Sequence, residues 1–242
     1  MTSSKALQIE KEIDAARCKA SWSTIPELTR RYKKHNSEGS VLEQTVLAEL
    51  TLTQTLSRYH REKGWYSSVY DDDTPDRISL PPRLPPELLK DVVTQLQNAL
   101  KLELSPKAKV VPMAAMQKEF ATIILARAHF ESGTYAKTLE LLDTTNVPLE
   151  RASTGYAFVL LIMSKTIKGI SLEMTGEITQ ALEFYDQVPT LLSQRPSEKS
   201  DELLNWSEEA LYRAALLRAR LGERPQRELS ISNVDARGPE RL

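Results

Sequence analysis

The sequence predicts an all-α protein whose helices pair into hairpins and stack as a solenoid. One observation is composition: there are only 8 glycines in 242 residues, whereas Leu, Ala, Glu, Lys and Arg are abundant. Strand-rich folds need many tight turns, which depend on Gly and Asn, and the abundant residues are good helix formers. The second observation is repetition, because GTYAKTLELLD at 133–143 recurs as GEITQALEFYD at 176–186. A helix-start pattern that occurs twice indicates repeated helical units.

The bulk properties exclude several classes of protein. The 32 basic and 33 acidic residues give a net charge of −1, whereas proteins that bind nucleic acid usually carry a basic excess. The single cysteine, Cys18, permits no internal disulfide and fits a reducing compartment. The N-terminus, MTSSKALQIEKEID, lacks the apolar segment of a secretory signal. The longest apolar run, 156–163, is shorter than the roughly 20 residues that span a bilayer. We therefore expect a soluble intracellular protein in which 156–163 is a buried helix.

Two helices are predicted at the start of the chain. The first covers 5–20 and has a partly apolar face. The second covers about 25–35, because Thr24 precedes Glu27 by three residues, the spacing of a capping box. Pro26 is tolerated in its first turn, where no intrahelical hydrogen bond is lost.

A third helix is predicted from about residue 41 to 60. Ser40 lies three residues before Glu43, so the capping-box spacing recurs at its start. Its apolar residues step by three and four, as they do on one face of a helix. The three helices together form a predicted N-terminal unit at 1–61.

The segment 62–86 interrupts this pattern. It contains five prolines and the acidic run DDD, and its apolar residues show no periodicity. We therefore expect a flexible loop rich in proline and aspartate. Pro86 can serve as the first residue of the next helix, which the apolar spacing extends to about residue 104.

A helical hairpin is predicted around Gly133. An apolar helix at 113–130 ends at Ser132-Gly133, and a second helix starts at Thr134. Alanines between the large apolar residues of the first helix allow a neighbouring helix to approach closely. The same arrangement of helix, glycine turn and helix is expected over 149–193, with the turn at Gly176.

A further long helix is predicted at about 200–221. Acidic residues lie at its start and arginines near its end, which suits the helix dipole. It ends at Leu221-Gly222, as if another turn followed. We thus expect helical repeats over 87–222, and the polar residues 223–242 to form a disordered tail.

The repetition is explained by stacking. One hairpin cannot bury its apolar face alone, whereas stacked hairpins share a continuous core. An aromatic or apolar residue follows each glycine by two places and a small one by five, a pattern similar to the tetratricopeptide repeat: Tyr135 and Thr138, then Ile178 and Ala181. The usual period is about 34 residues and here it is 43, so we expect longer helices or connections. An irregular helical bundle is the alternative.

Several stretches also resemble one particular family. They are WSTIPEL at 22–28 after a short charged helix, Glu119-Phe120, the turn at 133–135, and 176–182 with Tyr185. In their order and distances, these stretches resemble the tetratricopeptide repeat protein 7 family, whose fungal members are described as cargo-transport or endocytosis proteins. The likeness extends over most of the chain except the proline-rich loop and the polar tail.

The resemblance implies a superhelical adaptor. Family members link phosphatidylinositol 4-kinase to a lipid-anchored helical-repeat protein at the cytoplasmic face of the plasma membrane, with consequences for endocytosis. They are much longer than this chain, so the resemblance implies that the chain corresponds to the N-terminal portion. The alternative is a general peptide-binding tetratricopeptide module in another trafficking or chaperone pathway.

No residue pattern indicates catalysis. The three histidines, His35, His60 and His129, are far apart and none has a second ligand at a metal-site spacing. Cys18 has basic neighbours, which could depress its pKa, but no histidine at a motif-like distance. The chain has neither a glycine-rich phosphate loop nor a G-x-S-x-G motif. We expect no enzymatic activity, no cofactor and no metal.

One dense basic run stands out, formed by Arg30, Arg31, Lys33 and Lys34. A solvated helix end that suits the dipole is the simpler interpretation. The functional interpretation is contact with anionic lipid, to which each basic residue contributes about 1 kcal/mol near the surface.

The predicted repeat also offers a candidate partner-binding surface. Co-chaperone versions of the repeat clamp a carboxylate with Lys and Asn, and the equivalent places here hold Ile123 and Arg127. A chaperone-tail receptor is therefore not expected. An apolar groove around Phe120, Ile123 and Phe130 could take an amphipathic or extended peptide, unless an adjacent helix covers these residues.

Overall fold

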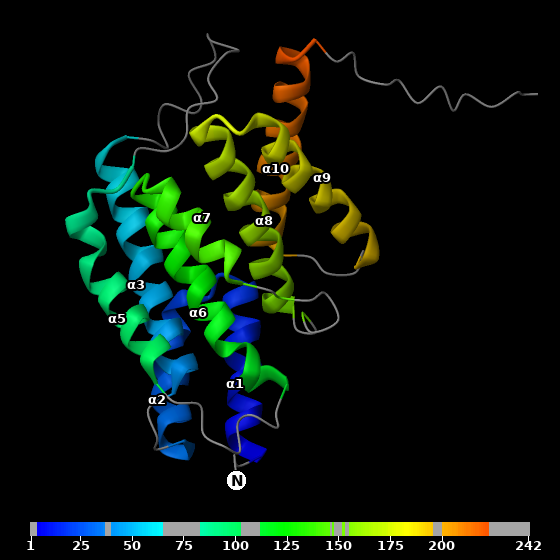
Figure 1. Cartoon of the computed structure of the whole chain (residues 1–242). Coiled ribbons are helices and arrows are strands. Elements are labelled where there is room, and N and C mark those ends of the chain that lie inside the picture. Colours follow the sequence, from blue (N-terminus) through cyan, green and yellow to red (C-terminus); the bar gives the residue numbers. More distant parts are fainter. Residues whose placement is uncertain are drawn as a thin grey trace, which may run out of the picture.

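The computed structural model describes residues 4–36, 40–64, 83–102, 112–145, 147, 152, 155–195 and 200–222. All regular elements in these ranges are helical (Figure 1), so the predicted all-α class is confirmed. The helices in chain order are α1 (Ser4–Cys18), α2 (Ile25–His35), α3 (Val41–Glu62), α5 (Pro86–Lys101), α6 (Pro112–Glu131), α7 (Tyr135–Asp143), α8 (Gly155–Thr175), α9 (Ile178–Gln194) and α10 (Asp201–Arg220), with a 3-10 turn (Trp22–Thr24) before α2.

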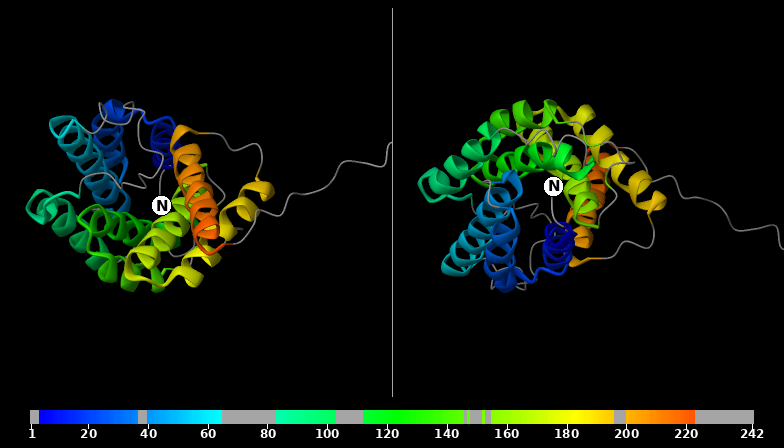
Figure 2. Two further views of the ribbon diagram at one scale, coloured as in Figure 1. Left: turned by 90° about the horizontal axis from the view of Figure 1, so that it is seen from above. Right: turned by 90° about the horizontal axis from the view of Figure 1, so that it is seen from below.

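The helices pack against their neighbours in chain order. From α3 onward each helix contacts the next, and contacts also join α3 to α6, α6 to α8, and α8 to α10. Seen along the helices, α3 to α10 curve into an arc (Figure 2). This is the arrangement expected of a solenoid of helical hairpins, in which each pair buries its apolar face against the next.

The two predicted glycine turns lie between paired helices. Gly133 and Gly176 adopt φ values of 77° and 93°, which glycine reaches without steric cost. At the first turn the Gly133 N–H donates to Phe130 O and the Thr134 N–H donates to His129 O, each at 2.9 Å. The second turn repeats both bonds one hairpin later. Both helices therefore end in a Schellman motif, which satisfies carbonyls at the helix end.

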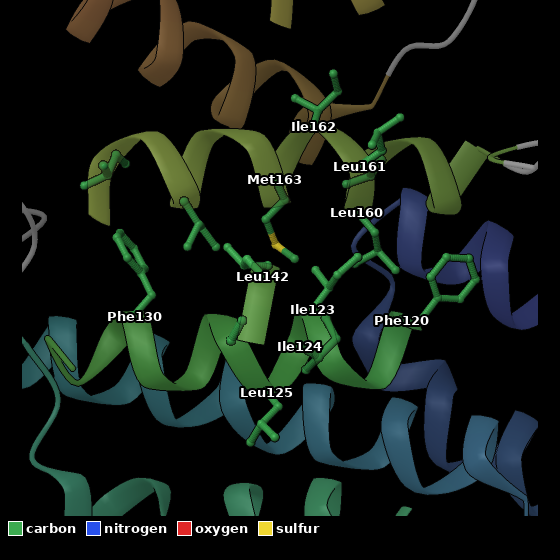
Figure 3. Packing of buried hydrophobic residues seen from close by; sticks show 14 of the residues in the cluster. Phe120, Ile123, Ile124, Leu125, Phe130, Leu142, Leu160, Leu161, Ile162 and Met163 are labelled. Atoms are coloured by element: carbon green, nitrogen blue, oxygen red, sulfur yellow. The ribbon is translucent and has the colours of Figure 1, made fainter. Parts of the chain in front are cut away.

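The core is centred on α6 and α8. Every residue of the apolar run 156–163 is buried, which confirms the prediction of a buried helix there. Figure 3 shows Phe120, Ile123 and Ile124 of α6 facing side chains of α8. Burial of one such side chain contributes about 1.5–3 kcal/mol, so these two helices form the stable centre of the stack.

The hairpin of α1 and α2 lies on the concave side of the arc (Figure 2). A separate apolar cluster joins it to the first half of α3, through residues such as Ile13, Ile25 and Val46, and Trp22 packs against this cluster. Helix α1 also contacts α8, in the middle of the stack. The N-terminal hairpin is therefore held by contacts with α3 and with α8.

Both ends of the predicted loop 62–86 lie within the described ranges. Helix α3 extends to Glu62, and residues 65–82 lie outside the described ranges. Arg83 and Leu84 are held against α6: the Arg83 side chain donates to Phe130 O, the Leu84 N–H donates to Glu131 O at 2.9 Å, and the Leu84 side chain is buried. Since α3 packs directly on α5, the predicted boundary at 62–86 falls inside one hairpin. The predicted tail, 223–242, lies outside the described ranges.

The two predicted capping boxes differ in outcome. Ser40 Oγ accepts a hydrogen bond from the Glu43 N–H at 3.0 Å, so Ser40 caps α3. Thr24 makes no such bond, because its backbone has helical angles and not the extended angles of a capping residue; its hydroxyl donates to Ser21 O, and Glu27 pairs with Arg30. The prediction for Thr24 is therefore wrong, although α2 starts where it was expected.

Candidate functional site

The predicted apolar groove on α6 is filled. Phe120, Ile123 and Phe130 are 7%, 1% and 4% exposed. Figure 3 shows Phe120 and Ile123 beneath α8, and Phe130 packs edge-on against Tyr135 of α7. The guanidinium of Arg83 covers the same two rings from the other side. Adjacent helices therefore cover these residues, which corrects their assignment as a partner-binding surface.

Arg127, the fourth predicted partner-binding residue, is also buried and is held by ion pairs within the chain. Its Nη1 lies 3.1 Å from Glu202 Oε1 in α10, and its Nε lies 3.8 Å from Glu131 Oε1 one turn along α6. Its guanidinium lies over the ring of Trp206, whose Nε1–H donates to the same Glu202. Arg127 therefore joins α6 to α10 and is not available to a ligand.

A second buried arginine occupies the neighbouring part of the inner face. Arg17 of α1 donates from Nε to Glu49 Oε2 at 2.8 Å, and its Nη2 lies 2.6 Å from the same oxygen. The guanidinium carbon lies 3.7 Å from the centre of the Tyr156 ring. The Tyr156 hydroxyl donates to the other oxygen of Glu49. Three helices, α1, α3 and α8, therefore meet at one carboxylate.

These two sets form one electrostatic unit, which we call the inner ionic cluster: Arg17, Glu49, Arg127, Glu131, Tyr156 and Glu202. Burial alone lowers the pKa of Arg127, but Glu202 and Glu131, and more weakly Tyr156 and Glu49, raise it overall. Arg17 responds in the same way, since Glu49 outweighs burial and raises its pKa. Both arginines therefore stay charged, and each has a carboxylate partner, as buried charges require.

The carboxyl group of Glu131 is the acidic group of the cluster whose charged form is disfavoured by burial. Burial raises its pKa, and the charges of Arg127 and Arg83 oppose this only in part. Burial likewise raises the pKa of the Tyr156 hydroxyl, with Glu49 adding to the effect. Tyr156 therefore stays protonated and acts as a donor to Glu49.

The inner ionic cluster is suited to holding helices in place. Its arginines and carboxylates are paired with one another, and its only hydroxyl, that of Tyr156, donates to Glu49. All but Glu202 are less than 9% exposed. The cluster therefore holds α1, α3, α6, α8 and α10 in fixed orientations relative to one another, and these orientations set the curvature of the stack.

A second buried network joins α8, α9 and α10 at the other end of the stack. Arg213 Nη1 lies 3.2 Å from Glu173 Oε2, and its Nε donates to Glu209 at 2.5 Å. The Tyr185 hydroxyl donates to Glu173 at 2.8 Å. Burial and the neighbouring Glu173 raise the Tyr185 pKa, so the hydroxyl remains a donor.

The predicted lipid-contact residues are exposed at the end of α2. Three of them lie beside carboxylates: Arg30 donates to Glu27 at 2.8 Å, Arg31 to Glu12 at 3.0 Å, and Lys33 Nζ lies 3.7 Å from Glu43. Lys34 is exposed without a carboxylate partner among the described residues. Exposed pairs of this kind are weak and are screened by salt, so the run can exchange its partners for an anionic surface.

An open groove lies between α8 and α9, beside Val147, which follows α7 in the chain. It has a volume of about 350 Å³ and is lined by Val147, Leu161 and Leu191 with Lys165, Glu183 and Asp186. A smaller cleft of about 90 Å³ adjoins it, where Lys165 and Lys168 lie over the ring of Phe184. Burial, and then the neighbouring Lys168, lowers the pKa of Lys165. The sequence interpretation assigned no role to this groove.

Comparison with protein-family models, curated proteins and solved structures finds no match. None of the helices in the described ranges has the length and apolar character needed to cross a bilayer. In the same ranges no three His, Cys, Asp or Glu side chains are grouped so that they could hold a metal ion.

The sequence analysis missed most of the inner ionic cluster. Glu49 lies between Ala48 and Leu50, and Arg17 follows Ala16, all of them buried. A charged residue within a helix segment of buried apolar residues is the signal that could have singled them out, because such residues are almost never buried unless paired. Which charges pair, however, depends on how distant helices meet.

Proposed function

We propose that this chain is a non-catalytic scaffold built from hairpins of the tetratricopeptide type. The observation that carries the proposal is the pair of equivalent hairpins, α6–α7 and α8–α9, each bent at a glycine in a Schellman motif and packed in chain order. Buried ion pairs between the helices support the same conclusion, because a fixed curvature suits a surface that holds partner proteins at set positions. Its functional groups serve packing, which argues against an enzyme.

We propose further that the scaffold helps to recruit phosphatidylinositol 4-kinase to the cytoplasmic face of the plasma membrane, with consequences for endocytosis. This task rests on the resemblance of 22–28, 133–135 and 176–182 to the tetratricopeptide repeat protein 7 family. The partners are the kinase and a lipid-anchored helical-repeat protein. The basic run on α2 is the proposed contact with anionic lipid.

The second candidate is a general peptide-binding module in another trafficking or chaperone pathway. The observation that favours it is the groove between α8 and α9, which is lined by apolar side chains and by charges of both signs. Against it, the concave side of the arc holds the α1–α2 hairpin, and Phe120, Ile123 and Phe130 are buried.

Reconstitution separates the two candidates. The purified chain is mixed with the purified kinase and its membrane anchor and run on a gel-filtration column. Co-elution of the chain with either protein supports the scaffold, and an unrelated lipid kinase serves as the control. A chain that elutes alone at micromolar concentration, yet binds extended peptides in a manner sensitive to Leu191→Glu at the half-exposed wall of the groove, contradicts the kinase task and supports the peptide-binding module.

A further inference from the structure

The outer face of α10 carries an uncovered apolar stripe. Seven large hydrophobic side chains are exposed in the described part of the chain, and four of them belong to α10 or its C-cap. Leu204, Leu211 and Tyr212 are 50%, 45% and 49% exposed. Exposed Ala215 and Ala219 continue the same side of the helix, since their spacing follows the helical period. We call Leu204, Glu208, Leu211, Tyr212, Ala215 and Ala219 the α10 stripe.

The stripe corresponds to the position at which the other hairpins receive their second helix. Ala126, Gly169 and Ala215 each lie seven residues before the glycine that ends their helix. At Gly169 the ring of Tyr185 in α9 lies so close that a Cβ would be 2.5 Å from it. At Ala126 the carbonyl accepts a weak hydrogen bond from Thr138 of α7. A small residue seven positions before the glycine therefore lets the following helix pack closely. On α10 the equivalent residue, Ala215, is exposed.

The residues that follow α10 do not have the sequence of such a covering helix. In the two hairpins, the second, fifth and sixth residues after the glycine are apolar or small, apart from Thr138. After Gly222 these places hold Arg224, Arg227 and Glu228. The pattern of the two hairpins therefore does not continue directly after Gly222, and uncovered apolar patches of this kind mark interaction sites.

The charges of α10 are arranged to match a second copy of the same helix. Among its charges that reach the surface, the first half carries acidic residues and the last turn carries arginines: Asp201, Glu208 and Glu209, then Arg218 and Arg220. An antiparallel pair of α10 helices brings opposite charges together at both ends, whereas a parallel pair brings like charges together. Antiparallel packing is also how each internal hairpin covers its first helix.

We propose that the α10 stripe binds the α10 stripe of a second copy of this chain, antiparallel about a two-fold axis. One register satisfies both the apolar and the charged residues. With the axis at the level of residue 213, Leu211 faces Ala215 of the partner, and Glu208 faces Arg218 of the partner. The two-fold axis repeats each contact, so the interface is self-complementary. Arg218 also pairs with Asp186 within its own chain, and a guanidinium group carries five N–H donors.

Sedimentation of the purified chain tests the proposal. We expect a dimer whose population rises with concentration, and a dissociation constant raised at least tenfold by Leu211→Glu, the change that corresponds to 1.4 kcal/mol. Leu88→Glu, at a leucine of α5 that is 42% exposed, is the matched control and leaves the dimer intact. Circular dichroism verifies that both variants remain helical. A chain that stays monomeric at hundreds of micromolar, or a dimer that survives Leu211→Glu, overturns the proposal.

Charge reversal tests the register. Glu208→Arg alone places two arginines opposite each other twice in the dimer, and Arg218→Glu alone does the same with two glutamates. Both single variants should weaken the dimer, and the double variant Glu208→Arg/Arg218→Glu should restore it. Restoration in the double variant supports antiparallel pairing at this register. If the double variant is as weak as the singles, the pairing of Glu208 with Arg218 is wrong.

Discussion

The guanidinium carbon of Arg17 in α1 lies 3.7 Å from the centre of the Tyr156 ring in α8. Both side chains are 1% exposed, and Glu49 of α3 accepts hydrogen bonds from both. The first helix of the chain is thereby tied to the middle of the hairpin stack. The N-terminal hairpin consequently belongs to the same folded body as the stack.

Removal of the Arg17 charge should be strongly destabilising. Arg17→Met leaves the Glu49 carboxylate buried with only the Tyr156 hydroxyl as a partner. Breaking a buried pair in this way costs about 3–5 kcal/mol, because the remaining charge is uncompensated. The free energy of unfolding, measured with urea, should fall by that amount.

Two further variants separate charge from packing at this site. In Arg17→Met/Glu49→Leu both charges are replaced by apolar groups, so we expect most of the lost stability to return. Arg30→Ala removes an exposed pair with Glu27 and should change stability by less than about 1 kcal/mol. A loss below about 1 kcal/mol for Arg17→Met would show that Glu49 is not buried as described.

Gly169→Ala should lower the free energy of unfolding, whereas a change from glycine to alanine inside a helix usually raises it. Alanine in place of glycine inside a helix normally stabilises it by about 1 kcal/mol. At this position the new Cβ would lie 2.5 Å from a ring carbon of Tyr185, so α9 must shift. We expect a net loss of about 1–3 kcal/mol, typical of overpacking, measured by thermal or urea unfolding.

A double-mutant cycle with Tyr185→Leu tests the cause of that loss. The shorter side chain removes the ring that the Cβ meets, so Gly169→Ala should become neutral or stabilising in this background. The interaction free energy between the two changes should then be of the order that contacting residues show, about 0.5–3 kcal/mol. Simple additivity of the two changes would contradict the close approach of α8 and α9.

Local patterns were sufficient to predict most of the helices. The glycine turns at 133 and 176 occur where they were expected, because a Schellman motif is determined by residues next to one another. Helix 25–35 was predicted with its observed ends. The predicted cap at Thr24 is absent because the preceding 3-10 turn gives Thr24 helical backbone angles, which a capping residue does not have. Those angles depend on the path of the chain before the helix.

The candidate site was less predictable, because its contacts are distant in sequence. The pattern around Phe120 and Ile123 shows that the face is apolar, but not whether a ligand or α8 covers it. The pairing of Arg17 with Glu49 depends on where α1 returns to the stack. The basic run of α2 was visible in the sequence, whereas its carboxylate partners on α1 and α3 were not.

Membrane binding should depend on the basic run of α2. The variant with Arg30, Arg31, Lys33 and Lys34 all changed to Ala should float less with liposomes that contain anionic lipid. Each basic residue contributes about 1 kcal/mol near such a surface, so the loss should be large. Raising the salt concentration should have the same effect on the unchanged chain.

Neutralisation of the acidic partners is the matched control. Glu12→Gln and Glu27→Gln release Arg31 and Arg30 from their exposed pairs, so flotation should increase. Flotation that is equally strong with neutral lipid, or that survives the fourfold Ala variant, would rule out this contact.

Glu131 should give the stability of the protein a distinct pH dependence. Its pKa is raised above 4.5 in the folded state by burial, so the folded chain holds a proton that the unfolded chain releases. The resulting stability is fully present below pH 4.5 and is lost as the pH rises through the folded pKa. The variant Glu131→Gln keeps the backbone carbonyl that accepts from the Leu84 N–H, but its side chain does not titrate.

Urea unfolding at a series of pH values should therefore show the unchanged chain losing stability relative to Glu131→Gln as the pH rises. A difference that stays constant with pH, or grows in favour of the unchanged chain, contradicts a raised pKa.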